Sequence, residues 1–257
     1  MTECIKMNRE HPGITIISLN RPDKRNALTI QLMNEVIDVV RETNELPDQR
    51  ALILQGEGSA FCTGLDLNEA GDLSVAEESA NAIAQMLFEI YSSSVITIAS
   101  VKGYAIAGGA GLSSVCDYVI ADENAKFGFP EVRRGLIPAI VLTFLKSQLK
   151  ERDLRELFLL GELVTAEEAK HIGLVNQVVP LDELEEDALA IARKALHGGP
   201  GSVTHLKRLI DHFTLRGFQA DLEHALAFHK MARTHKEAQE GIRAFIEKRN
   251  PSWYPEG

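Results

Sequence analysis

Short apolar runs alternate with longer segments of mixed polarity along the chain up to residue 180. Each run has the length and the aliphatic content that are typical of a buried strand. The runs that meet this description cover residues 14–19, 51–54, 95–101, 118–121 and 174–179. Because strands that alternate with helices favour layered architectures, this order predicts an α/β fold with parallel strand pairing.

The segments between these strands carry apolar residues at helical spacing. Residues 28–45 place Leu32 and Val36 on one face of a helix, and Thr29 and Asn26 are equal candidates for its N-cap. Further helices are expected from residue 72 or 74 to about 94, and at residues 112–115, 142–149, 152–160 and 166–171.

The character of the chain changes between residues 180 and 200. From residue 181 onward almost every segment is typical of a helix, with breaks at residues 198–201 and 217. This change predicts an α/β core over residues 1–195 and a C-terminal helical region over residues 196–257.

Composition and charge narrow the class of protein. The 257 residues are 45% apolar and 25% charged, as is ordinary for a chain that buries a large core. A net charge of −10 argues against nonspecific binding to nucleic acid or to an anionic membrane, although a few clustered cations could still hold an anionic ligand. No apolar run is long enough to span a bilayer, and no secretory signal is evident.

The cysteines give no sign of a disulfide framework or of a zinc site. Cys4, Cys62 and Cys116 are odd in number, scattered and outside any CxxC pattern. This usage fits a reducing compartment, and we expect a cytoplasmic protein. His224 and His229 are five residues apart and fall on different faces of a helix, so no metal site is predicted.

Two glycine-rich or small-residue loops carry the main hint of chemistry. Residues 55–63 and 102–111 each follow a predicted strand and lead into a helix. One backbone N–H group from each loop could converge on a carbonyl oxygen and stabilise the charge of an enolate. The alternative is a pair of structural turns with close packing between helix and strand.

Glu131 is the candidate base for such an enolate. It follows Pro130 among aromatic and aliphatic neighbours, which would raise its pKa towards the working pH. Its alternative is a surface ion pair with Arg133 or Arg134.

A cationic turn precedes the first predicted helix. Arg21, Lys24 and Arg25 could hold phosphate groups by charge, or could form a solvated turn. Asp66 could serve as an acid, although capping of the short helix that follows is the more frequent use of such a residue.

Taken together, these motifs resemble the crotonase superfamily, the enoyl-CoA hydratase/isomerase group, over nearly the whole chain. The motifs that carry the resemblance are NRPDKRNAL at 20–28, GSAFCTGLDL at 58–67, KGYAIAGGAGLSSVCD at 102–117, FGFPEVRRGLIPA at 127–139, GELVTAEEAKHIGLVNQVVP at 161–180 and GIRAFIEKRNPSW at 241–253. The resemblance implies a crotonase-like spiral of ββα units with a C-terminal helical region that trimerises, as a homotrimer or a dimer of trimers.

The resemblance also implies an acyl-CoA thioester as the substrate. The two oxyanion donors would be the backbone N–H groups of Leu65 and Gly108, and Glu131 would be a catalytic carboxylate. Phe245 and Lys248 would reach the CoA of a neighbouring subunit. The remaining positions that the resemblance assigns to the substrate and its CoA are Lys24, Arg25, Ala27, Ala60, Cys62, Gly64 and Asp66. No separate cofactor is implied, since coenzyme A is part of the substrate.

One departure from the family pattern bears on the reaction. Hydratases of this group usually place a second glutamate where this chain has Gly111. A single remaining base suits a 1,3-proton transfer by Glu131, which would move a double bond from the 3-position to the 2-position. Hydration, another enolate reaction such as decarboxylation or C–C cleavage, and a non-catalytic acyl-CoA binder remain alternatives.

Overall fold

The computed structural model describes residues 4–214 and 216–255. Within this part of the chain, the larger sheet has six strands in the order β1-β2-β3-β4-β6-β9. Every neighbouring pair from β2 onward is parallel, and β1 pairs antiparallel at the edge. The strands are β1 (Ile5–Asn8), β2 (Ile14–Leu19), β3 (Ala51–Gly56), β4 (Ile96–Val101), β6 (Tyr118–Asp122) and β9 (Gln177–Val179). The predicted parallel α/β architecture is therefore confirmed.

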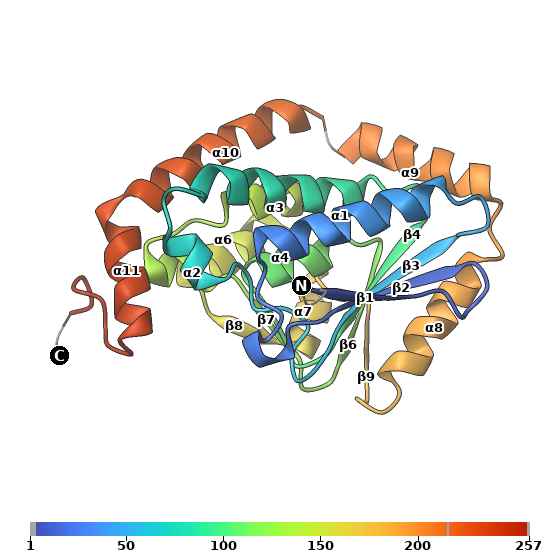
Figure 1. Cartoon of the computed structure of the whole chain (residues 1–257), viewed down its shortest axis with the longest axis horizontal. Coiled ribbons are helices and arrows are strands. Elements are labelled where there is room, and N and C mark those ends of the chain that lie inside the picture. Colours follow the sequence, from blue (N-terminus) through green and yellow to red (C-terminus); the bar gives the residue numbers. More distant parts are fainter. Residues whose placement is uncertain (1–3, 215, 256–257) are drawn as a thin grey trace.

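Helices cover both faces of this sheet (Figure 1). In β2, Ile17 and Leu19 belong to the main core, whereas Ile14 and Ile16 belong to a second core on the other face. This alternation follows from the two-residue repeat of a strand. Helices α1 (Ile30–Glu45) and α3 (Ala76–Tyr91) supply apolar side chains to the main core, and α8 (Leu184–Ala195) supplies those of the second core.

A second, smaller sheet was not predicted from the sequence. It contains β5 (Tyr104–Ile106), β7 (Lys126–Gly128) and β8 (Leu163–Thr165), in that order. Strands of three residues are too short to show a two-residue repeat, so only their pairing in the folded chain reveals them. This sheet carries the segment that precedes Glu131.

Two helix starts carry the caps that were predicted for them. The Thr29 side chain accepts a hydrogen bond from the Leu32 N–H and caps α1, so Thr29 rather than Asn26 is the N-cap. Thr165 and Glu168 form a reciprocal capping box at α7. The other helices are α2 (Leu67–Gly71), α4 (Gly108–Ser114), α5 (Ala139–Leu145), α6 (Glu151–Leu160), α7 (Ala166–Ile172), α9 (Pro200–Thr214), α10 (Phe218–Thr234) and α11 (Lys236–Ile246), with short 3₁₀ helices η1 (Pro22–Lys24) and η2 (Pro130–Arg134).

The sequence predicted a helix over residues 112–115, after the second glycine-rich loop, and this start is too late. Helix α4 begins at Gly108 and includes Gly109 and Gly111. Close packing explains these glycines, because a Cβ on Gly109 would lie 2.2 Å from the Cys62 carbonyl oxygen.

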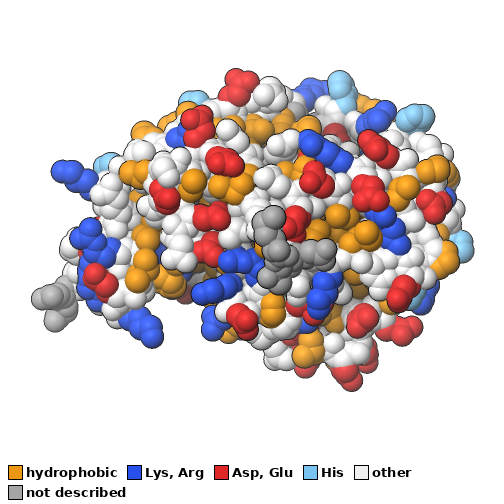
Figure 2. Space-filling model, in the orientation of Figure 1, with side chains coloured by type: hydrophobic (Ala, Val, Ile, Leu, Met, Phe, Trp, Pro, Cys, Tyr) orange, Lys and Arg blue, Asp and Glu red, His pale blue; other side chains and the backbone are white. Residues whose placement is uncertain are grey.

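The C-terminal helices α9 and α10 run along the top of the molecule in Figure 1, and α11 turns down at its left end. Helix α10 packs against α5 and α3, and α11 packs against η2. Helix α9 has no buried residue within its described length, and it exposes Leu206, Leu209, Ile210 and Phe213. On the face drawn in Figure 2, acidic and basic side chains are interspersed with apolar ones. Of the helices in residues 4–214 and 216–255, none combines the length and the apolar content needed to cross a bilayer.

Candidate active site

Two loops meet at the edge of the sheet where β3 and β4 end. Because these strands are parallel and paired in register, the segments that follow them leave the sheet on the same side. The loops then join as a short ladder, in which the Cys62 N–H donates to the Tyr104 carbonyl at 3.0 Å and the Ile106 N–H donates to the Cys62 carbonyl at 3.0 Å. The two loops predicted from the sequence therefore lie side by side at one edge of the sheet.

Gly64 allows the two loops to approach each other closely. Its φ is +88°, in the region that favours glycine, and an added Cβ would lie 2.8 Å from the Ala107 Cβ and 3.2 Å from the Gly108 nitrogen. Any other residue would separate the first loop from the N-terminus of α4.

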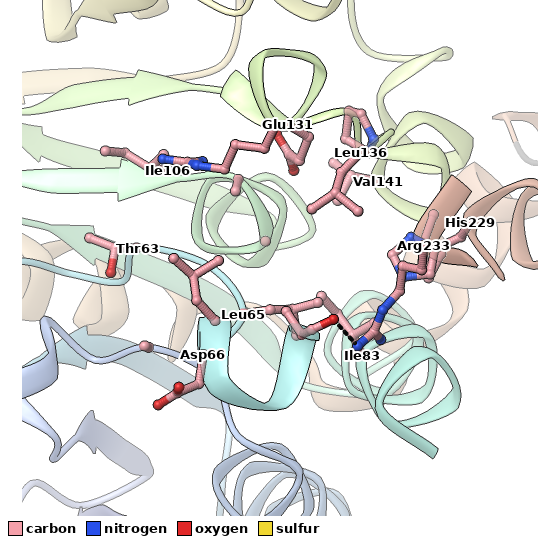
Figure 3. Close-up of a pocket in the computed structure, with 18 of the residues that line it drawn as sticks. Thr63, Leu65, Asp66, Ile83, Ile106, Glu131, Leu136, Val141, His229 and Arg233 are labelled. Carbon is pink, nitrogen blue, oxygen red and sulfur yellow. Dashed lines mark hydrogen bonds between the residues drawn. The ribbon is translucent and has the colours of Figure 1, made fainter. Parts of the chain in front are cut away.

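Residues of both loops line a common cavity. The Leu28 N–H donates to the Gly64 carbonyl and the Asp66 N–H donates to the Leu28 carbonyl, both at 2.8 Å, so the N–H of Leu65 between them points away from Leu28. Gly108 is the first residue of α4, where N–H groups have no intrahelical partner. Leu65 and Gly108 both line a cavity of about 360 Å³ (Figure 3).

Backbone strain marks the second loop. Ala107, the residue before α4, has φ 55° and ψ −126°, a conformation that L residues rarely adopt. Its N–H donates to the Gly128 carbonyl at 2.8 Å, so the smaller sheet holds it in place. Such strain is typical of functional sites, because the surrounding structure must maintain it.

Glu131 lies in the same cavity and is not a surface ion pair. Its carboxylate oxygen Oε2 is buried and has no hydrogen-bond partner among the described residues. Burial raises the pKa of Glu131 to about 7, while a backbone hydrogen bond and the charge of Arg134 oppose the rise. Arg133 pairs with Glu162 at 2.6 Å on the surface. The apolar surroundings expected for Glu131 are therefore confirmed.

Arg134 faces the cavity, although the sequence does not separate it from Arg133. Its guanidinium lies 4.1 Å from the centre of the Phe245 ring, a cation–π contact. Burial lowers the pKa of Arg134, and its Nε is buried without a hydrogen-bond partner in the described part of the chain.

The cationic turn borders the same cavity. Asn26, fully buried, accepts from the Arg21 N–H and donates to the Glu57 and Ala60 carbonyls, which fixes the turn. Arg21 pairs with Asp66 at 2.9 Å. Lys24 and Arg25 are exposed and line the cavity, as does Ala27. Arg21 is therefore paired, whereas Lys24 and Arg25 are available to bind a ligand.

Three further predicted positions have structural roles in the folded chain. Asp66 caps α2 by accepting from the Asn68 N–H at 3.1 Å, as expected, and it also lines the cavity. Ala60 and Cys62 are fully buried and do not line the cavity. Burial raises the pKa of Cys62 to about 12, so its thiol is neutral. Contact of Ala60 and Cys62 with CoA stays a prediction.

Phe245 lines the cavity of its own chain. Helix α11, which carries it, packs closely on η2, where a Cβ on Gly241 would lie 2.4 Å from backbone atoms of Arg134. The expectation that Phe245 reaches the CoA of a neighbouring subunit stays a prediction. Lys248 is exposed beyond the end of α11, and its assignment to a neighbouring subunit stays a prediction.

The position that would carry a second glutamate is filled by an apolar side chain. A Cβ added to Gly111 would lie 2.4 Å from Cγ2 of Val141, which lines the cavity and is 3% exposed. The space that a side chain at position 111 would need is therefore occupied by Val141.

Sequence reasoning missed two polar residues of the cavity, His229 and Arg233 on α10 (Figure 3). Only the fold shows that they face inward, because α10 also carries many exposed polar residues. Among residues 4–214 and 216–255, no group of three or more His, Cys, Asp or Glu side chains could hold a metal ion.

The fold is an α/β core whose two loops and helix α10 border one cavity that contains a buried carboxylate oxygen. The family model described as enoyl-CoA hydratase/isomerase matches residues 9–256. The chain therefore belongs to the enoyl-CoA hydratase/isomerase family, as its resemblance predicted.

Individual relatives agree with this assignment. The chain is similar to a short-chain-enoyl-CoA hydratase of Clostridium acetobutylicum, with 33% identity over 251 residues that cover 92% of each chain. Its fold is similar to an enoyl-CoA hydratase/isomerase of Xanthobacter autotrophicus Py2, with 29% identity, a TM-score of 0.89 and full coverage of both chains. An enoyl-CoA hydratase of Mycobacterium avium gives the same TM-score and identity over 99% of this chain and 100% of that one. These matches confirm the predicted crotonase fold.

Proposed function

We propose that this chain is an enzyme that acts on the carbon–carbon double bond of an acyl-CoA thioester through an enolate, with Glu131 as its single general acid and base. The observation that carries the proposal is the unpartnered carboxylate oxygen of Glu131 in the cavity that Leu65 and Gly108 also line. Membership of the enoyl-CoA hydratase/isomerase family supports an acyl-CoA substrate.

The backbone N–H groups of Leu65 and Gly108 hold the thioester oxygen. As a proton leaves the neighbouring carbon, negative charge moves to this oxygen, and the two fixed dipoles stabilise it without reorganisation. The N-terminus of α4 adds a positive electrostatic potential, which also stabilises negative charge on this oxygen.

Glu131 transfers the proton. A pKa of about 7 makes the carboxylate a stronger base than an exposed glutamate and leaves it able to return the proton near neutral pH. In a 3-enoyl-CoA, it removes a proton from C2, the C–H electrons form the enolate, and the same proton returns to C4. The double bond then lies at the 2-position, and no atom is gained or lost.

Lys24 and Arg25 bind phosphate groups of the CoA portion. Both side chains are exposed beside the cavity, and the neighbouring Arg21 is already paired with Asp66. Lys24 offers a compact charge on a flexible stem, and Arg25 offers a planar guanidinium that can donate two hydrogen bonds to one phosphate.

The filled space at Gly111 favours proton transfer over hydration. Hydration needs a group to hold and activate water opposite the first acid, and the methyl groups of Val141 take that place. Hydration is the second candidate, because the relatives described above are named hydratases.

Parallel assays with 2-enoyl-CoA and 3-enoyl-CoA separate the two reactions. We expect faster isomerisation of the 3-enoyl ester than hydration of the 2-enoyl ester, and loss of both in Glu131→Gln. Glu45→Gln, an exposed glutamate on α1, is the matched control. Hydration that survives Glu131→Gln would remove Glu131 from its proposed role.

We also propose that the chain assembles as a homotrimer or a dimer of trimers through its C-terminal helices. The apolar side chains that α9 exposes support an interface there. Light scattering on the purified protein measures the assembly mass, and a monomer at micromolar concentration would contradict the assignment.

A further inference from the structure

One end of the cavity carries two polar side chains that the proposed reaction does not use. His229 and Arg233 are four residues apart on α10 and therefore share a helix face. In Figure 3 they lie on one side of the cavity, whereas Thr63 and Asp66 lie on the opposite side. Asp66 pairs with Arg21 of the cationic turn, so His229 and Arg233 lie at the end far from the proposed CoA site.

Arg233 is a buried cation whose Nε is left free within the described chain. It is 3% exposed, and its terminal nitrogens donate to the carbonyls of Glu69, Ala70 and Ala76 at 2.8–3.2 Å. These bonds fix the guanidinium, while Nε is buried without a hydrogen-bond partner. No ion pair joins Arg233 to a carboxylate among the described residues, and the carboxylates of Asp72 and Glu69 act on it at longer range.

His229 presents a second unused polar atom. Its ring hydrogen-bonds to the backbone at Ile137, and its Nε2 is buried without a partner among the described residues. Burial, together with the charge of Arg233, lowers the pKa of His229 to about 4, so the ring is neutral in the free protein. Because the two residues are one helical turn apart on α10 and line the same cavity, one ligand group can meet both.

A buried cation without a paired anion is costly, and so is a buried polar atom without a hydrogen bond. Both are found here at the end of a largely apolar cavity. We propose that the acyl group of the substrate carries a second carboxylate at the end far from the thioester, and that Arg233 and His229 bind it. This inference rests on the proposed function, because it assumes that an acyl-CoA occupies the cavity.

The chemistry of a carboxylate accounts for both residues. One oxygen accepts from the Nε–H of Arg233, a charge-assisted hydrogen bond. The negative charge offsets the repulsion between Arg233 and a protonated His229, so the ring can take up a proton at Nε2 and donate to the other oxygen. The other ionisable residues that line the cavity are Lys24, Arg25, Asp66, Glu131 and Arg134, and the carboxylates of Asp72 and Glu69 act on Arg233 from outside this lining.

Binding of saturated esters tests the inference without turnover. Calorimetry compares CoA monothioesters of unbranched dicarboxylic acids with methyl-ended acyl-CoA of the same length, over a series of lengths. At the best length we expect the acid-ended ester to bind at least about tenfold more tightly, as hydrogen bonds to a charged group imply. Equal binding of the two series at every length would overturn the inference.

Variants assign the preference to these side chains. His229→Leu and Arg233→Met should bring the ratio close to one, while binding of methyl-ended esters changes by less than about twofold. His224→Leu, an exposed histidine on the same helix, should keep the wild-type ratio. Because Arg233 also ties α10 to α2 and α3, His229→Leu decides the outcome if Arg233→Met does not fold.

Two results would contradict the inference while the proposed function stands. One is an acid preference that persists in His229→Leu and Arg233→Met, and the other is a hydroxyl-ended ester that binds as tightly as the acid-ended one. Conversely, the proposed function is tested by turnover in Glu131→Gln, and a binding preference does not depend on that result.

Discussion

Replacing Glu131 by glutamine should remove activity and at the same time stabilise the protein at alkaline pH. Glutamine has nearly the same shape as glutamate but no charge. The wild-type carboxylate must ionise in a place where one of its oxygens is buried and unpartnered. Because burial raises its folded-state pKa from 4.5 to about 7, ionisation costs stability as the pH rises above 4.5, and the cost is complete above about 7.

The magnitude follows from the shift. Linkage between the two pKa values gives a cost of about 1 kcal/mol at about pH 5 and about 3 kcal/mol at about pH 8. The Glu131→Gln variant does not carry this cost. Its stability relative to the wild type should therefore increase by about 2 kcal/mol between the two pH values, a relative shift in Tm of roughly 5 °C.

Thermal or urea unfolding at the two pH values, at one protein concentration, measures this difference. Glu45→Gln on the surface of α1 controls for the loss of a charge alone and should show almost no change with pH. If Glu131→Gln gains no stability over the wild type between pH 5 and pH 8, then the carboxylate is hydrated in solution. In that case it could not serve as a base with a raised pKa.

Three further predictions test the rest of the site. Gly108→Pro removes one N–H donor at a helix start that tolerates proline, so turnover should fall at least about a hundredfold. Gly108→Ala keeps the donor and should keep most of the activity. Equal rates in the two variants would exclude the Gly108 N–H as an oxyanion donor. The pH dependence of kcat/KM should follow one ionisation near pH 7, that of Glu131, with a loss of activity below it. Arg134→Met should move this ionisation to higher pH, because the charge of Arg134 lowers the pKa of Glu131. Arg133→Met should leave it in place. Gly111→Glu alone should destabilise the protein by about 1–3 kcal/mol, because the new side chain clashes with Val141. The double variant Gly111→Glu with Val141→Ala should gain the ability to hydrate 2-enoyl-CoA. A double variant that folds without this gain would contradict the role assigned to the missing acid.

The sequence predicted most of the fold because its signals are local. The five parallel strands are continuous apolar runs, and their burial on both faces makes them visible without a structure. Thr29 and the pair Thr165 and Glu168 mark helix starts through hydrogen bonds within one turn. The strands β5, β7 and β8 could not be predicted, since each depends on partners distant in the chain.

The residue types of the site were predictable, whereas their surroundings were not. Glu131 could be chosen as a candidate from its apolar neighbours, but composition alone favoured a surface ion pair with Arg133 or Arg134. The fold decided against that pair, because it turns Arg133 to the surface and Arg134 onto Phe245. Sequence alone identified Gly111 as a departure from the family pattern, and gave no sign that Val141 fills the space beside it.

The amino-acid sequence by itself determined the parallel α/β architecture, the two loops and the family, because strand length, helix caps and glycine positions act within a few residues. Only the tertiary structure decided which polar atoms lie without partners in the cavity. The Nε of Arg233 and the Nε2 of His229 on α10, which have no hydrogen-bond partner in the described part of the chain, are the clearest cases. Desolvation depends on every segment that packs around a group, and here those segments come from α2, α3, η2 and α10, which are far apart in the chain.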